Sequence, residues 1–288
     1  MTRYFGRPAS RWAWRSVVLH SGIALALWAG PAPAHEFWLG ASSYRATRDT
    51  RVDISAAAGE GFSGEPKRYA DSRTAALTLH TDRQTDLMPL AAEADSNFAR
   101  VTAPDDSGMV ISFLSRFDHL SLPAARFNAY LVSEGLDEVA RSRLERGDGH
   151  REGKERYRRC AKIWIEGRPA LADRACRPVG LPFEIVPLTD PAPGGSISIR
   201  LLFEGRPAAG RLVQAWRASL NRSGGAFRGA DRDSTGTVTT VRTDARGEAT
   251  LHLPGPGEWL ISTLLMIPSR EADADWESYW ASFTFGRP

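Results

Sequence analysis

The sequence has few of the residue patterns that identify a metal site, a catalytic nucleophile or a phosphate-binding loop. It has only two cysteines among 288 residues, with neither a Cys-x-x-Cys nor a His-x-x-x-His spacing, which excludes the common zinc motifs. No Gly-x-Ser-x-Gly elbow is present, and the glycines at 59, 61 and 64 lack the Lys-Ser/Thr of a phosphate loop. Nothing in these patterns predicts an enzyme, and a metal site would have to be assembled by the fold.

Long hydrophobic runs are absent beyond the first 34 residues, so no membrane span is expected after that point. Residues 1–34 themselves combine spaced arginines, an apolar run from Val17 to Gly30, and small residues at Ala32 and Ala34. This is the layout of a cleavable signal peptide that ends at Ala34. We expect export by the general route to the periplasm. An uncleaved anchor is the alternative.

Cleavage after Ala34 would make His35 the first residue. A free α-amine and an imidazole on one residue can chelate a single transition-metal ion, and Glu36 offers an oxygen ligand beside them. His35 is therefore the predicted anchor of a divalent-metal site, for nickel or cobalt, with copper or zinc as other choices. The alternative is that His35 simply follows the cut.

Charge of one sign is not in excess once the signal is removed. The 37 basic residues include the four signal arginines, so 33 remain against 34 acidic ones. A nearly neutral chain gives no indication of nucleic-acid binding.

Cys160 and Cys176 form an even pair in a chain expected to enter an oxidising compartment. A disulfide between them would stabilise the fold by ~3 kcal/mol in the chain-entropy model. Two buried free thiols are the alternative.

Residues 35–188 are expected to form a β-rich sandwich domain, with short alternating strands up to about Leu114. A helical insertion is predicted over about residues 123–165, in pieces that meet at Gly135, with a last helix from about Arg151. The charged residues of that last helix, Arg159 among them, are expected on a solvated face, with a basic binding surface as the alternative.

Residues 189–288 follow a Pro/Gly-rich linker and contain about seven alternating segments separated by turns. Ile197, Ile199, Leu201 and Phe203 alternate with more polar neighbours and predict a half-buried strand. We predict an immunoglobulin-like or fibronectin-like β-sandwich. The fold class as a whole is mainly β, with two sandwich domains.

Further metal ligands are sought among the remaining histidines. His119 follows Asp118, which could orient its imidazole, and His80 ends an alternating strand where it could reach a sheet rim. Both are candidate ligands beside His35, with an ordinary surface or rim histidine as the alternative for each.

Several blocks of the sequence together resemble one bacterial family, the DUF4198-type proteins, which are usually described as the periplasmic component of ABC-type cobalt/nickel transport. The blocks are His35-Glu36-Phe37-Trp38-Leu39, Phe127-Asn128-Ala129-Tyr130-Leu131, Leu181-Pro182-Phe183-Glu184-Ile185-Val186-Pro187, Thr243-Asp244-Ala245-Arg246-Gly247 and Asp275-Trp276-Glu277-Ser278-Tyr279-Trp280.

The resemblance implies a non-enzymatic accessory that binds nickel or cobalt near an inner-membrane metal transporter. Two other functions stay open. One is a metal-independent scaffolding sandwich, and the other is an oxidative enzyme that holds copper with an N-terminal histidine.

Overall fold

Strand β1 (Glu36–Ala41) lies inside the protein with both of its faces covered: Glu36, Phe37, Trp38, Leu39 and Gly40 are all buried. The computed structural model describes Met1 and residues 36–92, 98–168, 173–218 and 235–287. Residues 2–34 of the predicted signal peptide and His35 lie outside the described residues. Pro33–Pro288 belongs to one compact unit, and the following paragraphs concern that unit.

The described strands form three sheets. The first, called the β1 sheet, has the order β1-β2-β3, with β6 also paired to β2. Its other strands are β2 (Arg51–Glu60), β3 (Ser63–Lys67) and β6 (Ala99–Thr102). The second, called the β11 sheet, contains β10 (Phe183–Pro187), β11 (Ser196–Phe203), β12 (Arg206–Pro207) and β15 (Glu248–His252).

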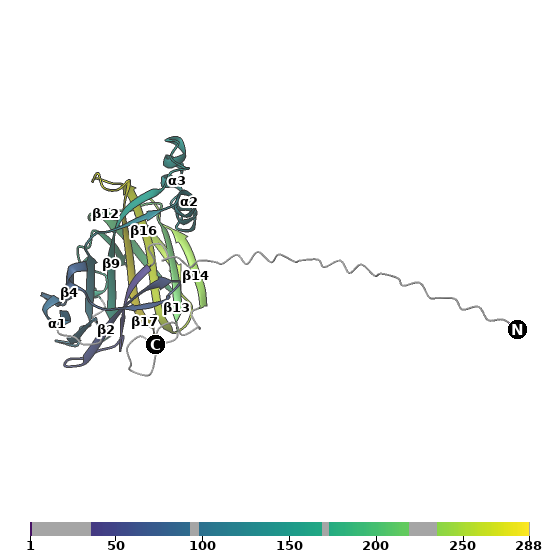
Figure 1. The fold of residues 1–288 in the computed structure, drawn as a ribbon. Coiled ribbons are helices and arrows are strands. Elements are labelled where there is room, and N and C mark those ends of the chain that lie inside the picture. Colours follow the sequence, from purple (N-terminus) through teal and green to yellow (C-terminus); the bar gives the residue numbers. More distant parts are fainter. Residues whose placement is uncertain (2–35, 93–97, 169–172, 219–234, 288) are drawn as a thin grey trace. The chain divides into compact units, whose positions relative to one another are not determined.

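The third sheet, called the central sheet, has nine strands within the described residues, in the order β14-β13-β16-β17-β9-β7-β4-β5, with β8 paired to β9. Its strands are β4 (Thr74–His80), β5 (Gln84–Asp86), β7 (Met109–Ser115), β8 (Asp118–Leu122), β9 (Gly153–Ile165), β13 (Leu212–Ala218), β14 (Thr235–Arg242), β16 (Gly257–Pro268) and β17 (Trp276–Arg287). Figure 1 shows the long strands β16, β17 and β9 running together through the molecule.

The other two sheets pack on opposite faces of the central sheet. Cys160 and Trp164 of β9 share a core with the β11 sheet, whereas Ala161 and Ile163 share a core with the β1 sheet. Because side chains alternate along a strand, β9 contributes to both cores. The structure therefore confirms the mainly β class and the two sandwiches. The two sandwiches share one sheet, which takes strands from both sides of the predicted boundary at residue 188.

The short helices are η1 (Asp71–Arg73), α1 (Met88–Ala92), α2 (Ala124–Ser133) and α3 (Asp137–Glu145). As predicted, two helical pieces meet at Gly135, which has a φ of 63° that suits glycine. Helices α2 and α3 lie together at one end of the long strands (Figure 1). Their buried side, with Phe127 and Leu131, packs on Leu264 and Trp280 of β16 and β17.

The helix predicted from Arg151 to about residue 165 is wrong, because Gly153–Ile165 is strand β9. Tyr157, Cys160, Ala161 and Trp164 have the spacing of a helical face, which caused the error. All residues from Cys160 to Ile165 are buried, since β17 and β7 flank this strand and sheets cover both of its faces. A strand buried on both sides loses the polar-apolar alternation that would identify it.

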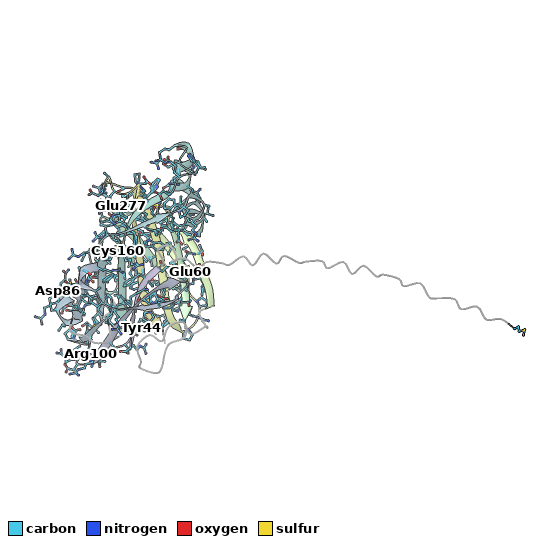
Figure 2. All side chains as sticks on the ribbon, in the orientation of Figure 1. Tyr44, Glu60, Asp86, Arg100, Cys160 and Glu277 are labelled. Carbon is cyan, nitrogen blue, oxygen red and sulfur yellow. The ribbon has the colours of Figure 1, made fainter. Side chains whose placement is uncertain are left out.

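The predicted disulfide is not formed either: Cys160 and Cys176 are both free thiols. Cys160 (labelled in Figure 2) is 1% exposed in the core between the central sheet and the β11 sheet. Burial raises the pKa of Cys160 to about 12, so the thiolate that disulfide exchange requires is scarce there. Cys176 is only partly buried, in the loop that precedes β10.

Candidate functional site

The alternation of β1 gives its two sides different surroundings. Phe37 packs on Phe113 of the central sheet, with ring centroids 4.8 Å apart. Trp38 points the other way and packs on Phe62, at 5.5 Å, and on the cluster that includes Trp216 and Leu260. The period of two places Glu36 on the side of Trp38. Glu36 therefore belongs to a buried face of the strand.

Carboxyl groups gather around Glu36. Burial raises the pKa of Glu36 to about 8, backbone N–H groups of Glu36 and Gly61 offset part of this shift, and repulsion by Glu134 and Glu60 adds to it. Burial also raises the pKa of Glu134 to about 7, with repulsion by Glu60 and Glu155. Glu60, labelled in Figure 2, ends β2, and Glu134 follows α2. Tertiary structure thus brings three carboxyls from separate elements within electrostatic range of each other.

Glu155 is the deepest acidic group near this cluster, at 1% exposure. Its Oε1 accepts hydrogen bonds from the hydroxyls of Tyr130, at 3.3 Å, and Ser278. Its buried Oε2 has no hydrogen-bond partner among the described residues. Burial raises the pKa of Glu155 to about 7, and the two hydroxyl hydrogen bonds offset part of the shift. These surroundings favour a carboxyl group that is protonated or paired with a cation over an isolated carboxylate.

Basic partners are missing from the acidic cluster, which is defined here as Glu36, Glu60, Glu134 and Glu155. Within the described part of the chain, none of the four forms an ion pair with a lysine, arginine or histidine, and no basic group contributes to the pKa shifts of Glu36, Glu134 or Glu155. An uncompensated buried carboxylate is costly, so a cation would be stabilised here.

The acidic cluster is not a complete metal site in itself. Among the residues that the structure describes, no three His, Cys, Asp or Glu side chains come close enough together to hold one ion. A metal at this end of β1 would need further donors. If the predicted signal peptide is cleaved after Ala34, His35 would supply an amine and an imidazole nitrogen next to Glu36. Two nitrogens and carboxylate oxygens suit divalent nickel, cobalt, copper or zinc.

The structure does not bring His80 and His119 together. His80 lies in register with Val110, which pairs with Trp164 of β9, whereas His119 pairs with Arg156 of the same strand. Those two positions on β9 are about 26 Å apart at about 3.3 Å per residue. One ion therefore cannot bind both histidines.

Each of these two histidines has another partner. Nε2 of His80 is 2.8 Å from Oγ of Ser112, and burial lowers the pKa of His80 to about 4. Nε2 of His119 is 2.9 Å from Oδ2 of Asp273 on the exposed surface. His80 is a core histidine, and His119 belongs to a surface pair.

Glu134 and Glu155 were missed by sequence reasoning. No role was assigned to Glu134, and Glu155 was placed on the solvated face of a helix that is in fact β9. No sequence signal identifies Glu155, because its neighbours Lys154 and Arg156 are charged as well and no polar-apolar alternation marks the strand. Glu36 was the one member of the cluster found from its position next to His35.

Fold and site together define a mainly β protein with two sandwiches on one shared sheet and an acidic cluster at the start of its first strand. The chain belongs to the family called domain of unknown function DUF4198, whose model matches residues 32–267. No curated protein matches it.

Among solved structures, the chain is similar to the "D0-D1 domain of Intimin", with 12% identity over 88% of this chain and 98% of that chain. The TM-score is 0.19, which is too low to support an argument about fold or function. Within the described residues, no helix is both long and apolar enough to cross a membrane.

Proposed function

We propose that this protein is exported to the periplasm, loses residues 1–34, and binds a divalent transition-metal ion, nickel or cobalt, through the new N-terminal His35. The acidic cluster around Glu36 is the observation that carries the proposal. Glu36 and Glu155 are buried, Glu36, Glu134 and Glu155 have raised pKa values, and no described basic residue neutralises the cluster.

The roles of the residues follow from their chemistry. His35 would chelate the ion through its α-amine and Nδ1, and Glu36 would supply an oxygen ligand. Glu60 and Glu134 would favour the cation electrostatically, since each interacts with Glu36. Because the pKa of Glu36 is raised to about 8, metal binding near neutral pH would release its proton as well as protons of the amine.

The transport role rests on the resemblance of the sequence blocks to proteins described as periplasmic components of cobalt/nickel transport. On that basis the protein would hold the ion near an inner-membrane transporter as a non-enzymatic accessory.

The test is a calorimetric titration of the purified exported protein with Ni(II) and Co(II). One variant carries an extra alanine before His35, which turns the amine into an amide and removes one donor. We expect this variant to bind at least about tenfold more weakly. The matched control is His252→Ala, which removes an exposed histidine of β15, a strand of a different sheet from β1, and should leave the affinity unchanged.

Equal affinity of the extended and native chains would remove His35 from the proposal. Recovery of a membrane partner that is unchanged by metal stripping would favour the metal-independent scaffold instead.

A further inference from the structure

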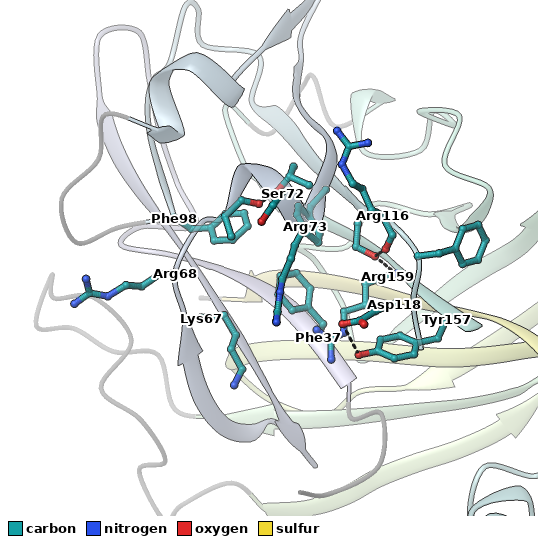
Figure 3. A pocket seen from close by; sticks show the side chains of 15 residues that line it. Phe37, Lys67, Arg68, Ser72, Arg73, Phe98, Arg116, Asp118, Tyr157 and Arg159 are labelled. Atoms are coloured by element: carbon teal, nitrogen blue, oxygen red, sulfur yellow. Dashed lines mark hydrogen bonds between the residues drawn. The ribbon is translucent and has the colours of Figure 1, made fainter. Parts of the chain in front are cut away.

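A second site lies on the Phe37 side of β1. It is a cavity of about 450 Å³ between β1, the segment around η1 and the beginning of β9 (Figure 3). Cavities of about 300–1,000 Å³ are the usual size for small-molecule sites. Its apolar wall contains Phe37, Phe98 and Phe113, with ring centroids of Phe98 and Phe113 5.3 Å apart. The wall is therefore suited to a flat apolar group.

Charge in this cavity is mainly positive. Five basic residues line it, and Asp118 is its only acidic lining residue among those the structure describes. The carboxylate of Asp118 accepts hydrogen bonds from the hydroxyl of Tyr157, at 3.4 Å, and from the backbone N–H of His119, at 2.9 Å. Asp118 forms no ion pair with an arginine of the cavity within the described residues. The cavity thus has an excess of positive charge.

Arg159 is the most enclosed of the basic residues. Its guanidinium carbon lies 5.4 Å from the ring centroids of both Phe37 and Tyr157. Its buried Nε has no hydrogen-bond partner among the described groups. Burial lowers the pKa of Arg159, Tyr157 and Asp118 raise it in part, and Arg73 repels it. A guanidinium nevertheless stays charged at neutral pH, so this cation lies near two aromatic rings and the carboxylate of Asp118.

Arg73 completes the arrangement. Figure 3 shows the ends of Arg73 and Arg159 near each other in the cavity, whereas Arg68 and Arg116 point away from it. The repulsion between Arg73 and Arg159 agrees with this view. The carboxylate of Asp118 lies near Arg159 and leaves the cavity with an excess of positive charge. Two neighbouring guanidinium groups with this excess can bind a doubly charged planar anion.

We propose that this cavity binds a small organic dianion, in which two carboxylates contact Arg73 and Arg159 and a flat apolar body lies against Phe37 and Phe98. The aromatic wall favours such an organic ligand over a bare phosphate ion, which would leave the rings without a partner. The site does not depend on His35 or on the acidic cluster.

The experiment is a calorimetric titration of the exported protein with 1,2-benzenedicarboxylate. The comparison compounds are benzamide, which keeps the ring without a charge, and inorganic phosphate, which keeps the charge without a ring. We expect saturable binding of the dicarboxylate, no measurable binding of benzamide, and at least tenfold weaker binding of phosphate. Equal binding of either comparison compound would overturn the proposal.

Single arginine variants test whether the dicarboxylate binds in this cavity. Arg159→Gln and Arg73→Gln should each weaken dicarboxylate binding at least about tenfold, since each removes a charged hydrogen-bond donor. Arg83→Gln removes an exposed arginine between β4 and β5, outside the cavity, and should change nothing. Arg73 is exposed, so its variant tests the site even if Arg159→Gln fails to fold. An equal loss in Arg83→Gln, or no loss in Arg73→Gln, would contradict the assignment.

Discussion

Glu36 and Phe37 are adjacent in β1, yet they face surroundings of opposite charge. Glu36 belongs to a group of carboxyls without described basic partners, whereas Phe37 lies under Arg159 in a cavity with an excess of arginine. A single strand buried on both faces can separate two such regions, because its side chains alternate. This difference is the basis of the two proposals, a cation on one side and an anion on the other.

The largest expected effects come from variants that remove a buried side chain from either face of β1. Leu39 and Trp38 are each 0% exposed, in two different core clusters. We expect Leu39→Ala to lower the free energy of unfolding by about 2–5 kcal/mol and Trp38→Ala by about 3–5 kcal/mol, as large cavities do. Urea unfolding would measure both.

The matched control for β1 is Val132→Ala, whose side chain is 74% exposed on α2. It should change stability by less than about 0.5 kcal/mol. A small effect of Trp38→Ala would mean that only one face of β1 is covered, and the separation of the two regions would fail.

The next test asks whether His80 belongs to the core or to a metal site. Its pKa is lowered from 6.5 to about 4 in the folded state, so between these values the unfolded chain binds the extra proton. Stability from this group is complete above pH 6.5 and is lost as the pH falls toward 4, by on the order of 3 kcal/mol. His80→Asn should flatten that part of the stability profile and leave Ni(II) affinity unchanged. A lost Ni(II) affinity would return His80 to the ligand set.

A smaller effect should separate the two sides of β1 directly. Glu36→Gln keeps the size of the side chain and removes its charge, so we expect about tenfold weaker Ni(II) binding, which is about 1.4 kcal/mol. Its binding of 1,2-benzenedicarboxylate should be unchanged. Arg159→Gln should give the reverse result. Calorimetry of both variants with both probes is the measurement, and parallel losses would show one coupled site instead of two.

The smallest effect is expected at His119. Its imidazole and Asp273 are both more than half exposed, and exposed ion pairs contribute about 0–1 kcal/mol. His119→Ala should shift the unfolding free energy by no more than that and leave Ni(II) binding unchanged. Thermal unfolding and a metal titration of the same sample would check this, and a marked loss of metal binding would place His119 in the site.

The sequence predicted those parts of the fold that depend on local patterns. The alternation of Ile197, Ile199 and Leu201 correctly predicted β11, and Gly135 correctly marked the junction between α2 and α3. Strand β9 was not recognised, because burial on both faces removes the period of two and leaves a spacing that also fits a helix. The sharing of one sheet by both sandwiches depends on the parallel pairing of β9 with β17, which no local pattern encodes.

Most residues of the two candidate sites could not be predicted from the sequence. Glu36 was found because it follows His35, but Glu134 and Glu155 come from segments about 100 residues away. Arg159 was expected on a solvated face, with a basic binding surface only as the alternative. Its position over Phe37 depends on how β1 crosses the central sheet, which is a property of tertiary packing.

The most direct test of the account is native mass spectrometry of the protein exported by cells and then supplied with Ni(II) and 1,2-benzenedicarboxylate together. The account predicts a chain that begins at His35 and carries one metal ion and one dicarboxylate at the same time. A chain that begins elsewhere and still binds the ion as tightly, or two ligands that exclude each other, would contradict it.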